Sequence, residues 1–175
     1  MSDLNHGDGV DPSHDWYAVY VRSRHEAVVA GRLRGRGLPV FSPSYRLRCR
    51  RQGRTLNVDH PLFPGYVFCQ FDLRERLGVL QTSGVVHIIG RGKDPEPVCK
   101  KEIATIQSMV GSGLPVQPQA YLRPGQRVRV VGGPLAGVEG TLLRTKGADL
   151  LVASIALLQR AVAVELMQDE VQPLY

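Results

Sequence analysis

Apolar and polar residues alternate with a period of two through several short segments, and each such segment predicts a β-strand. Residues 16–21 and 66–71 are the clearest, because both combine aromatic with β-branched side chains. In the second segment, Tyr66 and Phe68 are expected on one face and Cys69 on the other. Large apolar groups occupy both faces. One face can therefore form a core, while the other needs a helix, a linker or a partner protein to cover it.

Helical periodicity appears between these strands. Ser23 and Glu26 have the spacing of a capping box, so we expect a helix to begin there and to end at the glycines that follow residue 34. Its buried side is expected to consist of Ala27, Val28, Ala30 and Leu33. Asp72 is expected to cap a second helix over Leu73, Leu77 and Leu80. A third helix is expected over residues 100–110, with its apolar face made by Ile103, Ile106 and Val110.

The segment before the 66–71 strand predicts a hairpin and a bend. Residues 45–50 alternate apolar side chains with arginines, which is typical of a half-exposed strand with a basic outer face. Residues 51–54 are interpreted as the turn, and 55–58 as the returning arm. The bend follows at Pro64 and Gly65, because proline fixes φ and glycine tolerates backbone angles that other residues resist.

The composition of the chain and its pattern of apolar residues change after residue 111. Residues 112–120 contain two prolines and no charged side chain, so we interpret them as a linker. Residues 121–175 contain about five short apolar runs separated by glycine-rich turns, which predicts a small all-β barrel. Gly133, Gly137 and Gly140 are expected to be turn positions. The acidic segment 1–15 has no apolar periodicity and is expected to be a disordered tail.

Charge is concentrated in the middle of the chain. The net charge is +6, yet residues 16–110 hold sixteen basic and seven acidic residues, a balance of +9. Residues 22–54 alone contain ten arginines against the single Glu26. Because the guanidinium fork suits phosphate, a nucleic acid is the natural partner of this region, and a merely solvated basic face is the alternative.

The sequence gives little support to catalysis. The three cysteines, Cys49, Cys69 and Cys99, form no C-x-x-C pair, and the histidines have no metal-ligand spacing. The glycines from 133 to 140 are not followed by the Lys-Ser or Lys-Thr of a phosphate-binding loop. We therefore expect no enzyme, no cofactor and no metal. The chain also has no apolar run near the roughly 20 residues of a membrane helix, so a cytoplasmic protein without membrane contact is expected.

Several of these motifs occur in an order that resembles the NusG family of transcription elongation factors. The motifs are the Trp16-Tyr17 strand, the run from Phe63 to Phe68 that reads Phe-Pro-Gly-Tyr-Val-Phe, Thr82-Ser83-Gly84-Val85-Val86, and Gly133 to Gly140. The resemblance covers nearly all of residues 16–175. It implies an α+β protein: an NGN domain at 16–111, with helices packed on an antiparallel sheet, joined through 112–120 to an SH3-like KOW barrel at 121–175.

The resemblance also implies partners and the residues that contact them. In the family, the NGN domain binds the clamp helices of RNA polymerase and spans the main cleft, which promotes processive elongation. By position, the polymerase-binding residues here are Tyr20, Phe63, Pro64, Tyr66 and Phe68. Basic residues near the first helix and the hairpin touch non-template DNA or nascent RNA in RfaH-like members, and the corresponding residues are Arg22, Arg32, Arg36, Arg50, Arg51 and Arg54. We expect a monomer.

The sequences of two segments are more similar to the specialised antiterminators, RfaH-like and UpxY-like, than to housekeeping NusG. These segments are Pro61-Leu62-Phe63-Pro64 and residues 158–166. The chain has Ile155 to Arg160 where housekeeping NusG has a Phe-Gly-Arg motif, so recruitment of Rho or of a ribosomal protein cannot be assumed; a ribosomal protein is kept as a candidate partner of the KOW domain. The alternative function is a ribosome-associated or RNA-binding KOW protein.

Overall fold

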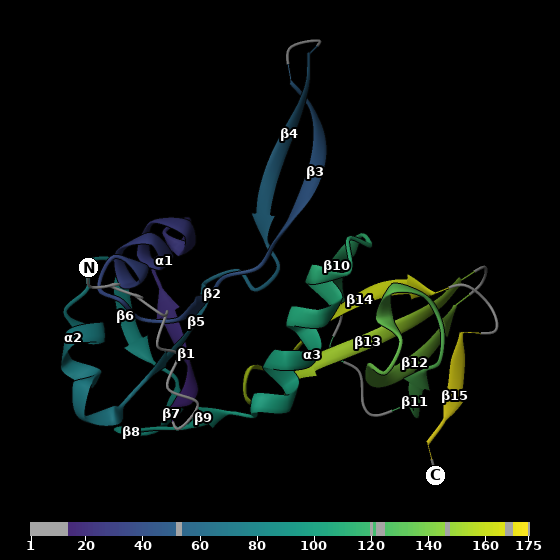
Figure 1. Ribbon diagram of the computed structural model, residues 1–175. Helices are drawn as coiled ribbons and strands as arrows, with labels where there is room; N and C mark the ends of the chain where they lie inside the picture. Colours follow the sequence, from purple (N-terminus) through teal and green to yellow (C-terminus); the bar gives the residue numbers. More distant parts are fainter. Residues whose placement is uncertain are drawn as a thin grey trace, which may run out of the picture.

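The computed structural model describes residues 14–51, 54–119, 121, 125–145, 148–166 and 170–174. Two antiparallel sheets dominate these residues, and a long two-stranded hairpin projects away from both (Figure 1). The expected combination of an antiparallel sheet with packed helices and a second all-β unit is confirmed, so the fold is α+β. The acidic segment 1–13 lies outside the described residues.

The first sheet has the strand order β2-β5-β1-β6, with β9 also paired to β1. Its strands are β1 (Asp15–Val21), β2 (Val40–Phe41), β5 (Tyr66–Phe71), β6 (Val85–Ile88) and β9 (Pro97–Val98). Strand β1 lies inside this sheet because β5 and β6 pair with its two edges, and its Ala18 and Val19 are fully buried. A short β7 (Gly90–Arg91) and β8 (Asp94–Pro95) pair separately.

The two faces of the first sheet have separate cores, as the alternation in residues 66–71 predicts. Val67, Cys69 and Phe71 pack with α1 (Glu26–Arg34) and α2 (Arg76–Leu80). Phe68 packs on the opposite face, in the cluster that contains the buried side chains of α3 (Lys100–Gly111). Helices on both sides of the sheet therefore cover most of the apolar surface on the two faces of β5.

The first helix differs from its prediction. Its N-cap is His25, without a side-chain capping bond, so the expected capping box at Ser23 and Glu26 is wrong. The buried side chains are Glu26, Val29, Ala30 and Leu33, whereas Ala27 and Val28 are exposed. These four positions have the i, i+3, i+4, i+7 spacing of one helix face, which starts one residue earlier than expected. Glu26 belongs to this face because its carboxylate accepts the amide of Gly65, as described below.

The second helix is also shorter than expected. Asp72 accepts a hydrogen bond from the amide of Arg74, but it caps the 3₁₀ turn η1 (Leu73–Glu75), and α2 begins after it. Val79 is the buried residue, while Leu77 and Leu80 are exposed. In α3 the buried residues are Ile103, Ile106 and Met109, so Met109 takes the core position expected for Val110.

The second sheet has the strand order β10-β14-β13-β12-β11-β15. Its strands are β10 (Val116–Gln119), β11 (Gln126–Val130), β12 (Glu139–Thr145), β13 (Ala148–Ile155), β14 (Arg160–Leu166) and β15 (Val171–Pro173), with 3₁₀ turns η2 (Gly133–Leu135) and η3 (Ala156–Leu158). Because β10 pairs with β14, four residues of the expected linker 112–120 belong to this sheet. Pro118 is tolerated there because β10 is an edge strand.

Candidate functional site

The bend at Gly65 is built around one glycine. Its φ is +85°, and a Cβ at this position would lie 3.1 Å from Cε2 of Tyr20. The Gly65 amide donates to Oε1 of Glu26 at 2.8 Å, and its carbonyl accepts from the amide of Val21 at 2.9 Å. Glycine is thus required both for the backbone angle and for the close approach of the Tyr20 ring. Glu26, which is 8% exposed, holds the bend from within the protein.

Two tyrosine rings lie together beside this bend. Tyr20 and Tyr66 are directly paired between β1 and β5, and their ring centroids are 5.5 Å apart at an angle of 56°. Tyr20 is 37% exposed, Tyr66 is half-buried and Pro64 is exposed. We call these three residues the sheet-end surface. It is a rigid aromatic surface at one end of the first sheet, of the kind that protein interfaces favour.

The other two expected polymerase-binding residues lie beneath the surface. Phe63 is 1% exposed and Phe68 is 0% exposed. Their rings meet edge to face with centroids 5.2 Å apart, and both belong to the cluster that includes the apolar side of α3. The five residues that the sequence predicts to bind polymerase therefore form two groups. Tyr20, Pro64 and Tyr66 are accessible, whereas Phe63 and Phe68 are buried.

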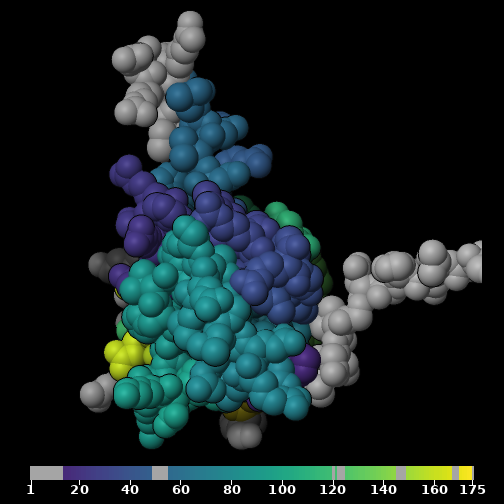
Figure 2. All heavy atoms as spheres, turned by 90° about the vertical axis from the view of Figure 1, so that its left-hand side faces the viewer, coloured from purple at the N-terminus to yellow at the C-terminus, as the bar shows by residue number. Residues whose placement is uncertain are grey.

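The arginines near the first helix differ in how they are used. Arg32 donates to the carbonyl of Ser83 at 2.5 Å. Arg36 donates to the carbonyl of Gly78 and to Oγ1 of Thr82. Both side chains are exposed, but these bonds tie α1 and the turn after it to α2 and to the segment that leads into β6, on the face of the molecule that Figure 2 shows. Arg22 is exposed, and its backbone holds the neighbouring loop: its amide donates to the Gly84 carbonyl at 2.9 Å, and its carbonyl accepts from the amide of His25 at 3.0 Å.

The hairpin of β3 (Ser44–Arg51) and β4 (Arg54–Pro61) has two unlike faces. Register pairs Arg46 with Asp59 and Arg48 with Asn57 on one face, where Nε of Arg46 lies 3.2 Å from the Asp59 carboxylate. The opposite face carries Leu47, Leu56 and Val58, which are 40–49% exposed. The side chains of Arg50, Arg51 and Arg54 lie outside the described residues.

Arg46 and Arg48 were not among the nucleic-acid-binding candidates, although they occupy the basic face of the hairpin. The same arginine alternation that predicts the strand also assigns them to the face of Arg50. The sequence signal was therefore present. Arg48 and the partly paired Arg46 extend the candidate basic surface from the tip of the hairpin toward its base.

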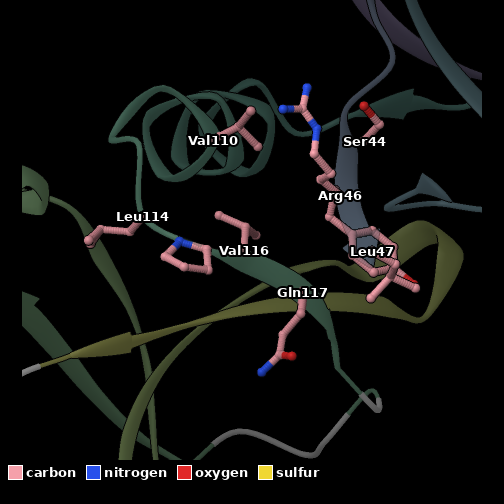
Figure 3. Close-up of a pocket in the computed structure, with 9 residues that line it drawn as sticks. Ser44, Arg46, Leu47, Val110, Leu114, Val116 and Gln117 are labelled. Carbon is pink, nitrogen blue, oxygen red and sulfur yellow. The ribbon is translucent and has the colours of Figure 1, made fainter. Parts of the chain in front are cut away.

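A cavity of about 440 Å³ lies at the base of the hairpin (Figure 3). Its walls come from the start of β3, the end of α3 and the beginning of β10. They consist of Ser44, Tyr45, Arg46, Leu47, Val110, Leu114, Pro115, Val116 and Gln117. The lining is mostly apolar and contains one guanidinium but no carboxylate, so it offers no pair of groups for acid-base chemistry.

Helix α3 also contacts the second sheet through charged groups. Nζ of Lys101 lies 2.7 Å from Oε2 of Glu139, and Arg129 donates to Oε1 of the same carboxylate at 2.6 Å. The hydrogen bonds from Lys101 and Arg129 lower the pKa of Glu139 to about 2. The amide of Ala156 donates to Glu102 at 3.3 Å, while burial raises the pKa of that carboxyl. Helix α3 is thereby joined to the second sheet and to η3 by specific polar contacts.

The glycines of the second sheet have two different roles. Gly133 and Gly137 have φ of +70° and +87°, values that favour glycine in a turn. Gly140 instead lies within β12, and a Cβ there would be 2.8 Å from Cδ1 of Leu151. Gly140 is therefore needed for close strand packing and is not a turn residue.

Within the described ranges, no group of three His, Cys, Asp or Glu side chains could hold a metal ion. Burial raises the pKa of the Cys69 thiol to about 12, which keeps it protonated and unreactive as a nucleophile. Among the same residues, none of the helices is long and apolar enough to cross a membrane.

These features define a two-part binding protein with an aromatic surface on one sheet and basic side chains around it. The family model described as "Transcription termination factor nusG" matches residues 14–107. The chain is 31% identical over 157 residues to the transcription termination/antitermination protein NusG of Deinococcus radiodurans, covering 74% of this chain and 83% of that protein. The chain therefore belongs to the NusG family of transcription factors.

Two further comparisons agree. The NusG protein of Thermus thermophilus is 31% identical over 150 residues, which cover 74% of this chain and 82% of that protein. A solved structure, "Domain interaction in Thermotoga maritima NusG", has a TM-score of 0.52 and 22% identity, covering 93% of this chain and 98% of the other. The second of these supports the fold alone.

Proposed function

We propose that this chain is a specialised, RfaH-like or UpxY-like member of its family that binds the clamp helices of RNA polymerase and promotes processive elongation. Residues 16–111 act as the NGN domain in this proposal, and residues 121–175, together with β10 at Val116–Gln119, act as the KOW domain. The sheet-end surface makes the contact with the clamp. The NGN domain then spans the polymerase cleft and bridges its two sides.

The observation that carries the proposal is the construction of the sheet-end surface. Tyr20 and Tyr66 remain accessible although a large aromatic core lies next to them. Their positions are held by the Gly65 bend and by the buried Glu26, so little conformational entropy is lost when a partner binds. Tyr66 packs against the buried cluster that contains Phe63 and Phe68, and we assign these two residues a structural part in binding.

The basic residues are proposed to lie near the non-template DNA strand. Arg22 is the strongest candidate because it is exposed and close in sequence to Tyr20. Arg32 and Arg36 contribute positive potential while they hold the α2–β6 segment. The hairpin arginines, Arg50, Arg51 and Arg54, would add phosphate contacts whose strength falls as salt rises.

The assignment of this chain to the specialised members of the family is supported by the sequences of two segments and by one contact. Ile155 to Arg160, the residues found where housekeeping NusG carries its Phe-Gly-Arg motif, include η3 in this chain. The amide of Ala156 is engaged by Glu102 of α3. The start of this segment is therefore in contact with α3, and we assign it no Rho partner, while a ribosomal protein stays a candidate partner of the KOW domain.

The proposal is tested by measuring binding of the full chain to reconstituted RNA polymerase elongation complexes, to free RNA and to free single-stranded DNA. Tyr66→Ala is expected to weaken binding to the complex about tenfold or more, because aromatic anchors carry much of the affinity of protein interfaces. Tyr121→Ala is the matched control, since Tyr121 is also an exposed tyrosine (44%) but lies far along the chain from the sheet-end surface.

Thermal unfolding of each variant checks that its fold is kept. Tight binding to free RNA, with no gain when polymerase is present, would contradict the proposal. That outcome would instead support the alternative function, an RNA-binding or ribosome-associated KOW protein.

A further inference from the structure

His87 lies beside the sheet-end surface on a third strand. It is paired directly with Tyr20 across β1 and β6, and the two ring centroids are 5.1 Å apart at an angle of 45°. The His87 side chain is exposed. Because Tyr20 is also paired with Tyr66, one row of rings crosses three neighbouring strands in the order Tyr66, Tyr20, His87.

A strand irregularity produces this placement. The register between β1 and β6 shifts between Tyr20 and Val21, so that Val21 pairs with Val85 and Tyr20 with His87. Val86 is the extra residue and is 50% exposed. A bulge of this kind re-aims the side chains next to it. It brings His87 level with Tyr20, so the row of rings continues onto β6.

The surroundings of the row carry positive charge. Arg22 follows Tyr20 by two residues, and its amide donates to the carbonyl of Gly84 just before β6. Arg24 is exposed in the same loop and has a φ of +63°. The acidic residue of this segment, Glu26, is buried and accepts the Gly65 amide. A partner segment that combines apolar side chains with carboxylates would complement this surface.

The ring geometry favours a protein partner over stacked bases. Successive bases stack on flat aromatic faces that stand free. Here the rings are inclined to each other by 56° and 45° and pack against one another, so they form a continuous corrugated surface. Such a surface suits side chains that pack into it, as in the centres of protein interfaces.

We propose that His87 is a third contact residue of the polymerase-binding surface, and that the row Tyr66, Tyr20, His87 receives an acidic, partly apolar segment of RNA polymerase. This inference rests on the proposed function. The His87 ring contributes through packing beside Tyr20, and the exposed Arg24 meets the carboxylates of the partner. The contact surface thereby extends from β5 across β1 to β6.

The test measures the affinity of the full chain for RNA polymerase elongation complexes with His87→Ala, His87→Phe and His60→Ala. His87→Ala is expected to weaken binding about fivefold to tenfold, and His87→Phe to stay within about twofold because it keeps a ring. His60→Ala is the matched control, since His60 is likewise paired with a tyrosine, Tyr45, at a ring distance of 5.9 Å, but lies on the hairpin.

The outcomes separate this inference from the proposed function. If His87→Ala binds as tightly as the natural chain while Tyr66→Ala is weakened, the inference is overturned and the proposed function stands. If the natural chain does not bind the polymerase complex, both fall. Loss of binding to free single-stranded DNA in His87→Ala, with unchanged binding to polymerase, would also overturn the inference. Thermal unfolding of His87→Ala and His87→Phe confirms that both variants are folded.

Discussion

Gly65 is the residue on which the geometry of the sheet-end surface depends most directly. Gly65→Ala is expected to destabilise the protein by about 3 kcal/mol, because alanine resists a positive φ and its Cβ would press on the Tyr20 ring at 3.1 Å. Urea unfolding measures the change in the free energy of unfolding. Polymerase affinity should fall as well, since the Tyr20 ring must move.

Gly37→Ala separates the two causes. Gly37 has a φ of +80°, but a Cβ there would meet no atom within 4 Å. The expected loss is therefore about 1 kcal/mol, from the backbone angle alone. If the two variants were equally destabilised, the close approach of Tyr20 to Gly65 would have no energetic weight, and the account of the bend would be wrong.

Elements were predictable where local pattern decides them and less so where a distant contact does. The alternation from Tyr66 to Phe71 was sufficient to assign both faces of β5. Ser23 and Glu26 satisfy a local capping rule, yet the Glu26 carboxylate binds the amide of Gly65, 39 residues away. A single sequence does not reveal that competition. The same holds for Phe68, because alternation does not tell whether α3 covers its face.

The contact between α3 and the second sheet gives a prediction about pH. Because the folded pKa of Glu139 is about 2, below the ordinary value of about 4.3, its ion pairs stabilise the fold at all pH values above that ordinary value. This stabilisation is lost as the pH falls toward 2. A carbon-13 NMR titration of the Glu139 carboxyl is expected to show a midpoint near 2.

Lys101→Met tests whether α3 supplies part of that effect. The midpoint of Glu139 should rise in this variant, while Arg129 keeps it below the ordinary value. Arg74→Met is a control, because Arg74 pairs with Asp72 elsewhere in the protein. An unchanged Glu139 midpoint in Lys101→Met would mean that α3 and β12 are not in contact in solution.

At the scale of the whole molecule, the order of motifs allowed the α+β organisation to be predicted, but not how tightly its parts are joined. The segment 112–120 lacks charge and contains prolines, so it has the composition of a linker. In the structure, Val116–Gln119 closes one edge of the second sheet as β10. An edge strand needs few amide donors, which is why a proline-containing segment can serve there.

The packing of the whole chain also decides which of the expected polymerase-contact residues are accessible. Tyr20, Pro64 and Tyr66 remain accessible, whereas Phe63 and Phe68 are enclosed by the core that includes α3. Sequence similarity assigns all five residues to one surface, because it does not record which of them the rest of the chain covers. Only the packing of α3 on the first sheet makes that distinction.

The most direct test of the central claim is site-specific crosslinking within elongation complexes. A photoreactive phenylalanine analogue replaces Tyr20 in one variant and Tyr121 in another, and mass spectrometry identifies the crosslinked partner. The account predicts that position 20 crosslinks to the clamp helices of RNA polymerase and that position 121 does not. Crosslinks from position 20 to RNA or DNA, with none to polymerase, would contradict it.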